Sequence, residues 1–255
     1  MSKINKNKKI MKGVILAGGL ATRLYPLTYV TNKHLLPIYD KPVIYYVIEK
    51  MVEVGIDKIM IVTSPHHMED FIKLLGSGER FKPSGRGNQI QIVYGVQNEP
   101  LGIAQGLWIA KDYIGKDNCM LHLGDNIIED DLSSIIKDFE NGAQIFLKKV
   151  KNPESFGVAN LDAKGRLLEI EEKPKNPKSD MAVVGVYLYD NTVFDKFEGI
   201  NKSKRGEYEI TYINNKYIKE GGMRTHILKE KWFDTGSFDS LIEAGNYMKD
   251  KKSKK

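Results

Sequence analysis

Short, continuously apolar segments alternate along the first half of the chain with segments whose apolar residues recur at helical spacing. This alternation constrains the fold more than any other feature of the sequence. Apolar runs without polar interruption are typical of strands in a parallel sheet that helices cover on both faces. The predicted strands are residues 14–17, 58–63, 90–94 and 118–123, and the predicted helices between them are residues 42–54, 68–75 and 102–114.

The pattern changes after residue 142, where short strands follow one another and turns separate them. No low-complexity linker divides the chain, so the second half is expected to pack onto the first. The predicted fold is therefore α/β, with a Rossmann-like central sheet that is mixed but mostly parallel, flanking helices and a smaller lobe. The predicted strands of this half are residues 143–150, 157–161, 167–171 and 183–189, and its predicted helices are residues 207–220 and 237–248.

The positive charge of the chain is concentrated at its ends. The formal net charge is +6, but residues 2–12 carry five lysines and no acid, and residues 249–255 carry five lysines against one acid. We expect a basic extension over residues 1–10, one domain over residues 11–248 and a lysine-rich tail over residues 249–255. Because these lysines form no stripe interleaved with aromatic residues, we do not expect nucleic-acid binding.

Nothing in the sequence predicts a membrane or secreted protein. No apolar run is long enough to cross a membrane, and no segment has the layout of a signal peptide. The single cysteine, Cys119, lies in an apolar run and is expected to be a buried, inert thiol. We therefore expect a cytoplasmic protein. The oligomeric state stays open, and a homo-oligomer is compatible with the sequence.

A glycine pair follows the first predicted strand. Gly18 and Gly19 come directly after residues 14–17, and Arg23 lies four residues further on. Glycines let backbone N–H groups approach a ligand closely, and arginine suits phosphate. Ligands of open α/β sheets bind beyond the carboxyl ends of the strands, so this segment predicts a nucleotide phosphate site. An ordinary glycine-rich turn is the alternative, since neither a Walker motif nor G-x-G-x-x-G is present.

Asp125 is a candidate metal ligand, and Asp234 is a second acidic residue far from it in the sequence. Asp125 follows a predicted strand in Leu-Gly-Asp-Asn, and Asp234 lies in Trp-Phe-Asp-Thr-Gly. Mg²⁺ takes few protein oxygens and leaves positions for phosphate, so a carboxylate at the end of a strand, such as Asp125, would suit it. Taken singly, Asp125 could instead occupy a turn or helix cap, and Asp234 could cap the helix that is predicted to begin at residue 237.

Several motifs, in order along the chain, resemble those of the sugar nucleotidyltransferase family. Residues 16–28 are similar to the family's Leu-Ala-Gly-Gly-x-Gly-Thr-Arg-Leu-x-Pro-Leu-Thr, with Ala21 in place of glycine or serine. Two further departures are Val184 and Tyr212, where the family usually has threonine and aspartate. The other matches are Lys-His-Leu-Leu-Pro at 33–37, Val-Gln at 96–97 with Gly-Ile-Ala-Gln at 102–105, Leu-Gly-Asp-Asn at 123–126, Phe-Gly-Val at 156–158, Glu-Glu-Lys-Pro at 171–174, Arg-Gly-Glu at 205–207 and Trp-Phe-Asp-Thr-Gly at 232–236.

Within that family the chain looks most like the short-form glucose-1-phosphate thymidylyltransferases, because it ends soon after the last predicted helix. The resemblance implies that the chain transfers a nucleotidyl group from dTTP to glucose 1-phosphate. The products would be dTDP-glucose and pyrophosphate, for nucleotide-sugar and polysaccharide biosynthesis. Without the long form's C-terminal extension, we expect product-type nucleotides to inhibit only by competition at the active site.

The resemblance also implies roles for individual residues. Arg23 and Lys33 would be catalytic, and Asp125 and Asp234 would hold Mg²⁺. The implied nucleotide-binding residues are Leu16, Ala17, Gly18, Gly19, His34, Gln97 and Gly102. The residues implied to bind the sugar phosphate, in a smaller lobe, are Gly157, Glu172, Lys173, Tyr187 and Arg205.

Three alternatives stay open. The first is a uridylyltransferase or another sugar-1-phosphate nucleotidyltransferase, because thymine and uracil share one hydrogen-bonding edge. The second is a nucleotide-sugar sensor without activity, against which the presence of Arg23, Lys33, Asp125 and Asp234 argues. The third is a nucleic-acid-binding protein, which only the basic isoelectric point suggests.

Overall fold

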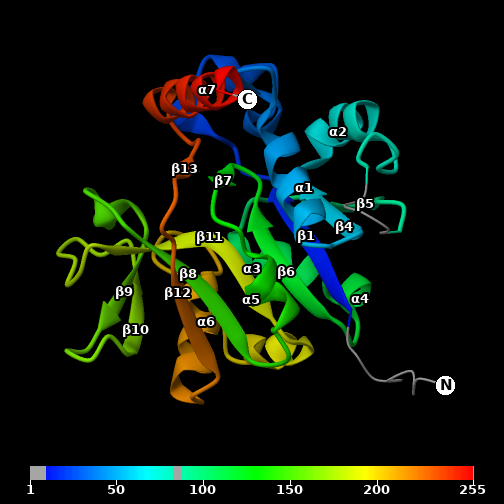
Figure 1. Ribbon diagram of the computed structural model, residues 1–255. Coiled ribbons are helices and arrows are strands. Elements are labelled where there is room, and N and C mark those ends of the chain that lie inside the picture. The colour runs from blue at the N-terminus through cyan, green and yellow to red at the C-terminus, as the bar shows by residue number, and fades with distance from the viewer. Residues whose placement is uncertain (1–9, 83–87, 255) are drawn as a thin grey trace.

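The computed structural model describes residues 10–82 and 88–254. Within these residues, nine strands form one sheet in the order β10-β9-β11-β6-β1-β4-β5, with β8 beside β11 and β12 beside β8 (Figure 1). The strands are β1 (Met11–Ala17), β4 (Lys58–Thr63), β5 (Gln91–Val96), β6 (Asn118–Leu123), β8 (Ala143–Lys149), β9 (Gly157–Leu161), β10 (Leu167–Glu172), β11 (Met181–Tyr189) and β12 (Met223–Ile227).

The sheet changes from parallel to antiparallel between β6 and β11. Strand β1 pairs in parallel with both β4 and β6, and β4 pairs in parallel with β5. Strand β11 runs antiparallel to β6, β8 and β9. The predicted mixed sheet is therefore confirmed, and its first half is the parallel, Rossmann-like part.

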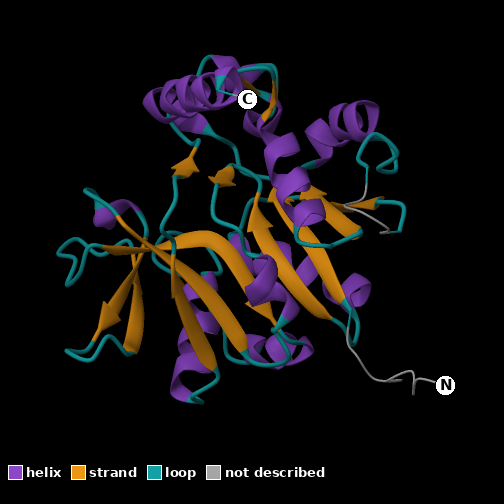
Figure 2. Cartoon of the chain, in the orientation of Figure 1, coloured by secondary structure: helices purple, strands orange, loops and turns teal. Residues whose placement is uncertain are grey.

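Helices cover both faces of the sheet (Figure 2). None of those in the described parts of the chain is both long and apolar enough to cross a membrane. The helices are α1 (Val43–Glu53), α2 (Met68–Leu75), α3 (Ile103–Ile109), α4 (Lys111–Ile114), α5 (Ser133–Lys137), α6 (Ile210–Lys219) and α7 (Phe238–Ser253).

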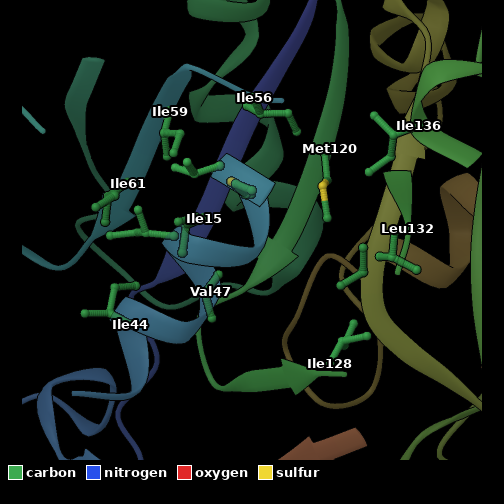
Figure 3. Close-up of a cluster of buried hydrophobic side chains, with 14 of the residues drawn as sticks. Ile15, Ile44, Val47, Ile56, Ile59, Ile61, Met120, Ile128, Leu132 and Ile136 are labelled. Atoms are coloured by element: carbon green, nitrogen blue, oxygen red, sulfur yellow. The ribbon is translucent and has the colours of Figure 1, made fainter. Parts of the chain in front are cut away.

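The apolar residues of β1 are continuous because its two faces pack into two different cores. Ile15 contributes to the core beneath α1 and α2, whereas Val14 and Leu16 contribute to the core that α3 and α6 cover. Successive side chains of a strand point to opposite faces, so both faces need apolar residues here. Figure 3 shows the first of these cores, where Ile15, Ile59 and Ile61 of the sheet meet Val47 of α1.

Three predicted helices differ from the observed ones at their ends. Residues 102–114 form two helices, α3 and α4, that meet at Ala110. Helix α6 begins at Ile210 instead of residue 207, because the backbone of Tyr208 is bonded to the loop before α3 and to the first turn of α3. Its N–H donates to the Leu101 carbonyl at 2.7 Å, and its carbonyl accepts from Ala104 N–H at 3.2 Å. The last helix does not end at residue 248.

Helix α7 continues to Ser253, which corrects the prediction that residues 249–255 form a solvated tail outside the domain. Two of its lysines find partners on the body of the protein, since Lys251 pairs with Glu129 and Lys252 pairs with Asp40. Ser237 caps the other end of the helix. The predicted extension over residues 1–10 lies outside the described residues, apart from its last residue.

Several short strands were not predicted. They are β2 (Pro37–Ile38), β3 (Lys41–Pro42), β7 (Asn126–Ile128), β12 and β13 (Trp232–Asp234). Strand β12 reads Met-Arg-Thr-His-Ile, and its polar residues are tolerated because it lies at an edge beside β8. Strands β7 and β13 pair with each other outside the main sheet, where they position the candidate site.

Candidate active site

The glycine pair after β1 forms one wall of a cleft at the carboxyl end of the parallel strands. A Cβ atom on Gly18 would lie 2.5 Å from Gln97 Oε1, so a larger residue would displace this amide. Ala21, which stands where the family has glycine or serine, adopts φ 52° and ψ 40°. This left-handed conformation costs a non-glycine residue about 1 kcal/mol, so alanine is accommodated here with a small loss of stability relative to glycine.

This cleft has a volume of about 460 Å³. It contains every predicted nucleotide-binding residue except Ala17, together with both predicted catalytic residues. Ala17 is fully buried, and its carbonyl accepts hydrogen bonds from Asn32 Nδ2 at 3.0 Å and Thr63 Oγ1 at 3.1 Å. The residues of the wall include Leu16, Gly18, Gly19, Arg23, Lys33, His34, Gln97, Gly102, Asp125 and Arg205.

The amide of Gln97 is held in one orientation. Its Nε2 donates to Gln105 Oε1 at 2.8 Å and to the Gly102 carbonyl at 3.3 Å, so its Oε1 faces Gly18. Gly102 has φ 104°, and a Cβ atom there would lie 2.6 Å from the Tyr208 carbonyl. This position therefore requires glycine, both for its backbone conformation and for the close approach.

His34 lies at the base of the cleft as a neutral imidazole. Burial, and then the charge of Lys33, lowers the pKa of His34 to about 3. Its Nδ1 lies 2.5 Å from Asn32 Oδ1, which can only accept, so the proton is on Nδ1. Nε2 is then left as a hydrogen-bond acceptor.

Strand pairing brings the two predicted metal ligands together. Asp234 ends β13 opposite Asn126 of β7, and Asp125 directly precedes β7. Thr235 donates to the Asp125 carbonyl from both its backbone N–H and its hydroxyl, each at 2.9 Å. Segments that lie more than a hundred residues apart in the sequence thus hold Asp125 and Asp234 side by side.

The two carboxylates have opposite electrostatic environments. Burial alone would raise the pKa of Asp125, but ion pairing with Lys33 and further polar neighbours hold it well below its usual range. Burial, and then the charge of Asp125, raises the pKa of Asp234 to about 6. A divalent cation between them would relieve this repulsion. Within the described residues, no group of three or more Asp, Glu, His or Cys side chains is placed to hold a metal ion, so such a cation would also need ligands from water or substrate.

A second, smaller cavity of about 140 Å³ adjoins the cleft, and we call it the sugar cavity. All five residues that the resemblance implies for sugar-phosphate binding line it. Glu172 is held by Thr211, whose hydroxyl donates to Glu172 Oε2 at 2.5 Å. The five residues are Gly157, Glu172, Lys173, Tyr187 and Arg205.

Of the four predicted cations of the site, two form ion pairs with carboxylates and two do not. Lys33 and Arg205 are neutralised by carboxylates: Lys33 by Asp125, and Arg205 by three glutamates at 2.8–3.4 Å, namely Glu172, Glu207 and Glu209. Within the described chain, Arg23 and Lys173 form neither a hydrogen bond through the side chain nor an ion pair. Arg23 lines both cavities, so this cation lies where they meet, and its charge partly offsets the rise in the pKa of Asp234.

Sequence reasoning assigned no role to several residues of the sugar cavity. They are Asn126, Glu207, Glu209, Thr211, Asn214 and Trp232. Asn126 is a junction: its Nδ2 donates to Asp125 Oδ1 at 2.8 Å, and its Oδ1 accepts from Trp232 Nε1 at 2.8 Å. The sequence did contain signals for some of them, because Asn126, Glu207 and Trp232 lie within the motifs that resemble those of the family. Thr211 and Asn214 are three residues apart on a predicted helix and hence lie on one face.

Comparison with known proteins agrees with this geometry. The family model described as Nucleotidyl transferase matches residues 12–251. Curated glucose-1-phosphate thymidylyltransferases of Mycolicibacterium smegmatis and Neisseria meningitidis serogroup A are 44% and 43% identical over 244 residues, covering 94% and 93% of this chain and 82% of each relative. The chain therefore belongs to the nucleotidyl transferase family.

Solved structures give the same result. A Bacillus anthracis protein assigned to the glucose-1-phosphate thymidylyltransferases and crystallised with sucrose has a TM-score of 0.86 and 44% identity, over 93% of this chain and 95% of that one. A UDP-glucose pyrophosphorylase in complex with UDP-glucose has a TM-score of 0.80 at 24% identity, over 95% and 99% of the two chains, and shares the fold.

Proposed function

We propose that this chain transfers a deoxythymidylyl group from dTTP to glucose 1-phosphate, giving dTDP-glucose and pyrophosphate. The observation that carries the proposal is the junction of two cavities at Arg23, with Asp125 in the wall of one and Asp234 in the wall of the other. The larger cavity suits a nucleoside triphosphate and the smaller one a hexose phosphate. The names of relatives at 43–44% identity support this pair of substrates.

The base would be recognised by Gln97. Because its Nε2 is engaged by Gln105 and Gly102, its Oε1 is the free group and accepts a hydrogen bond. Thymine and uracil present an N3–H donor between two carbonyl acceptors, which suits such an acceptor. UTP shares this edge, so we expect it to be a slower alternative substrate.

The reaction is an in-line displacement. A phosphate oxygen of glucose 1-phosphate attacks the α-phosphorus of dTTP, the bond from that phosphorus to the bridging oxygen breaks, and pyrophosphate leaves. The second pKa of a phosphate monoester is near 6, so the attacking group is already anionic and needs no general base. Arg23 would stabilise charge at the junction, Lys33 would contact the triphosphate, and Lys173 and Arg205 would align the sugar phosphate.

Asp125 and Asp234 would hold Mg²⁺. Two adjacent carboxylates, one with a raised pKa, fit a hard cation that takes its other ligands from phosphate and water. When bound, the ion would neutralise phosphate charge. The residues that would support it are Thr235, which fixes the Asp125 backbone, and Asn126, which orients the Asp125 carboxylate.

The proposal is tested by pyrophosphate release from dTTP, UTP, ATP and GTP with glucose 1-phosphate and Mg²⁺, with products identified by mass. We expect dTTP to give the highest kcat/KM, UTP a lower one, and the purine nucleotides little release. The Asp125→Asn variant serves as the inactive control. Nucleotide-sugar binding without any pyrophosphate release would favour a sensor, and preference for a purine nucleotide would refute the role of Gln97.

A further inference from the structure

One buried amide donor in the wall of the sugar cavity has no partner within residues 10–82 and 88–254. Asn214 is 1% exposed, and its Nδ2 forms no hydrogen bond. The four other buried side-chain atoms without partners belong to residues that line neither cavity of the site: Tyr113, Asn118, His122 and Asn160. A buried donor left unpaired costs free energy, so a ligand group that satisfied it would gain binding energy.

The amide of Asn214 is fixed before any ligand binds. Its Oδ1 accepts a hydrogen bond from Tyr189 Oη at 2.6 Å. The Tyr189 ring is fully buried and stacks between those of Tyr187 and Tyr217, at centroid distances of 6.0 and 5.9 Å. One end of the amide is thus held by a rigid aromatic stack, which leaves the other end to present its N–H groups.

Asn214 lines the sugar cavity together with Thr211, Glu172 and Arg205. Thr211 and Asn214 share one face of α6, and Thr211 contacts Glu172, which in turn contacts Arg205. Arg205 and Lys173 are the cations proposed to bind the sugar's phosphate. Arg205 precedes the start of α6, and Asn214 lies about one helical turn beyond Thr211, so along the helix Asn214 is further from Arg205 than Thr211 is.

We propose that Asn214 determines sugar specificity by donating a hydrogen bond from Nδ2 to a hydroxyl on the part of the hexose ring remote from the phosphorylated carbon. This assignment rests on the proposed function, because it takes the sugar cavity to hold a hexose 1-phosphate. Thr211 and Glu172 would then bind the part of the ring near the phosphorylated carbon, while Asn214 would donate a hydrogen bond to the hydroxyl on C3, C4 or C6. A site built to bond a hydroxyl discriminates against an analogue that lacks it, since its buried donor is then left unpaired.

The test compares kcat/KM for glucose 1-phosphate with that for its 2-, 3-, 4- and 6-deoxy analogues, with dTTP as the second substrate. The variants are Asn214→Ala and, as a matched control, Asn160→Ala. The control removes another buried amide that has an unpartnered atom but lines neither cavity. Wild-type enzyme should lose about tenfold or more on one of the 3-, 4- or 6-deoxy analogues.

Asn214→Ala should lose about tenfold on glucose 1-phosphate and nothing further on that analogue, while Asn160→Ala should keep the wild-type preference. Equal losses on every sugar, or an unchanged preference in Asn214→Ala, would overturn the assignment. The wild-type measurements test the assignment even if Asn214→Ala fails to fold. Equal wild-type kcat/KM values for glucose 1-phosphate and all these analogues would overturn the assignment too. Failure of the wild type to use glucose 1-phosphate at all would instead contradict the proposed function, and with it this assignment.

Discussion

Replacing Asp234 with asparagine should stabilise the fold at neutral pH while it slows catalysis. Asp234 lies next to Asp125, and burial together with that neighbouring charge raises its pKa from 3.8 to about 6. Asparagine has the same shape and keeps an Oδ1 to accept the hydrogen bond that Gly236 N–H donates at 3.1 Å. The substitution therefore removes a repelled charge without removing the local structure.

The raised pKa of Asp234 sets both the size of the expected gain in the free energy of unfolding and the pH range over which that gain develops. The folded chain binds a proton at Asp234 more tightly than the unfolded chain does, so ionisation of Asp234 opposes folding as the pH rises. At 1.36 kcal/mol per pH unit, a rise from 3.8 to about 6 corresponds to about 3 kcal/mol. This penalty is absent below about pH 4, grows between about pH 4 and 6, and is complete above that window.

Urea unfolding of the wild type and Asp234→Asn at pH 8 and pH 4.5, without divalent cations, measures this effect. The variant should be more stable by up to about 3 kcal/mol at pH 8, and the difference should shrink at pH 4.5. Asp239→Asn, five residues further on and exposed, is the control, with no such gain expected. A variant no more stable than wild type at pH 8, or a gain independent of pH, would refute the reasoning.

Other substitutions test separate parts of the site. Asp125→Asn should lower kcat at least about 100-fold, or about 2.7 kcal/mol, with the fold retained by circular dichroism; near-normal turnover would exclude Asp125 as a ligand. Lys173→Ala should raise the KM for glucose 1-phosphate far more than that for dTTP, and equal effects on both would end this assignment. Gly18→Ala should displace Gln97 and raise the KM for dTTP; an unchanged KM would argue against base recognition there. Ala21→Gly should remove the strain of the left-handed backbone at this position and leave the stability of the fold nearly unchanged or slightly higher. A loss of more than about 1 kcal/mol in thermal unfolding would contradict the idea that Ala21 is strained.

The sequence predicted the parallel half of the fold well because its strands are buried on both faces. The run at residues 58–63 and the one at 118–123 coincide with β4 and β6, and the helix at residues 68–75 coincides with α2. In each case continuous apolar residues or a clear helical period left one interpretation. Strand β12 could not be found this way. Within the described residues it pairs only with β8 at the edge of the sheet, where its side chains are largely exposed and need no apolar pattern.

The predicted site residues do lie together, but their charge partners could not be inferred from the sequence. The local sequence around Arg205 shows glutamates nearby, yet the contact with Glu172 depends on β10 lying against the start of α6. The length of α7 was underestimated for a similar reason, since Lys251 is held by Glu129 from a distant part of the chain. Pairings of this kind follow from tertiary structure and leave no local pattern.

The central claim is that this site joins glucose 1-phosphate to the α-phosphorus of dTTP. ³¹P nuclear magnetic resonance of one reaction mixture with Mg²⁺ tests it most directly, because each phosphorus atom can be followed. The signals of dTTP and glucose 1-phosphate should fall together, while the two coupled signals of a sugar diphosphate and the signal of pyrophosphate rise in equal amounts. Loss of dTTP with glucose 1-phosphate left intact, or no change in any signal, would contradict the account.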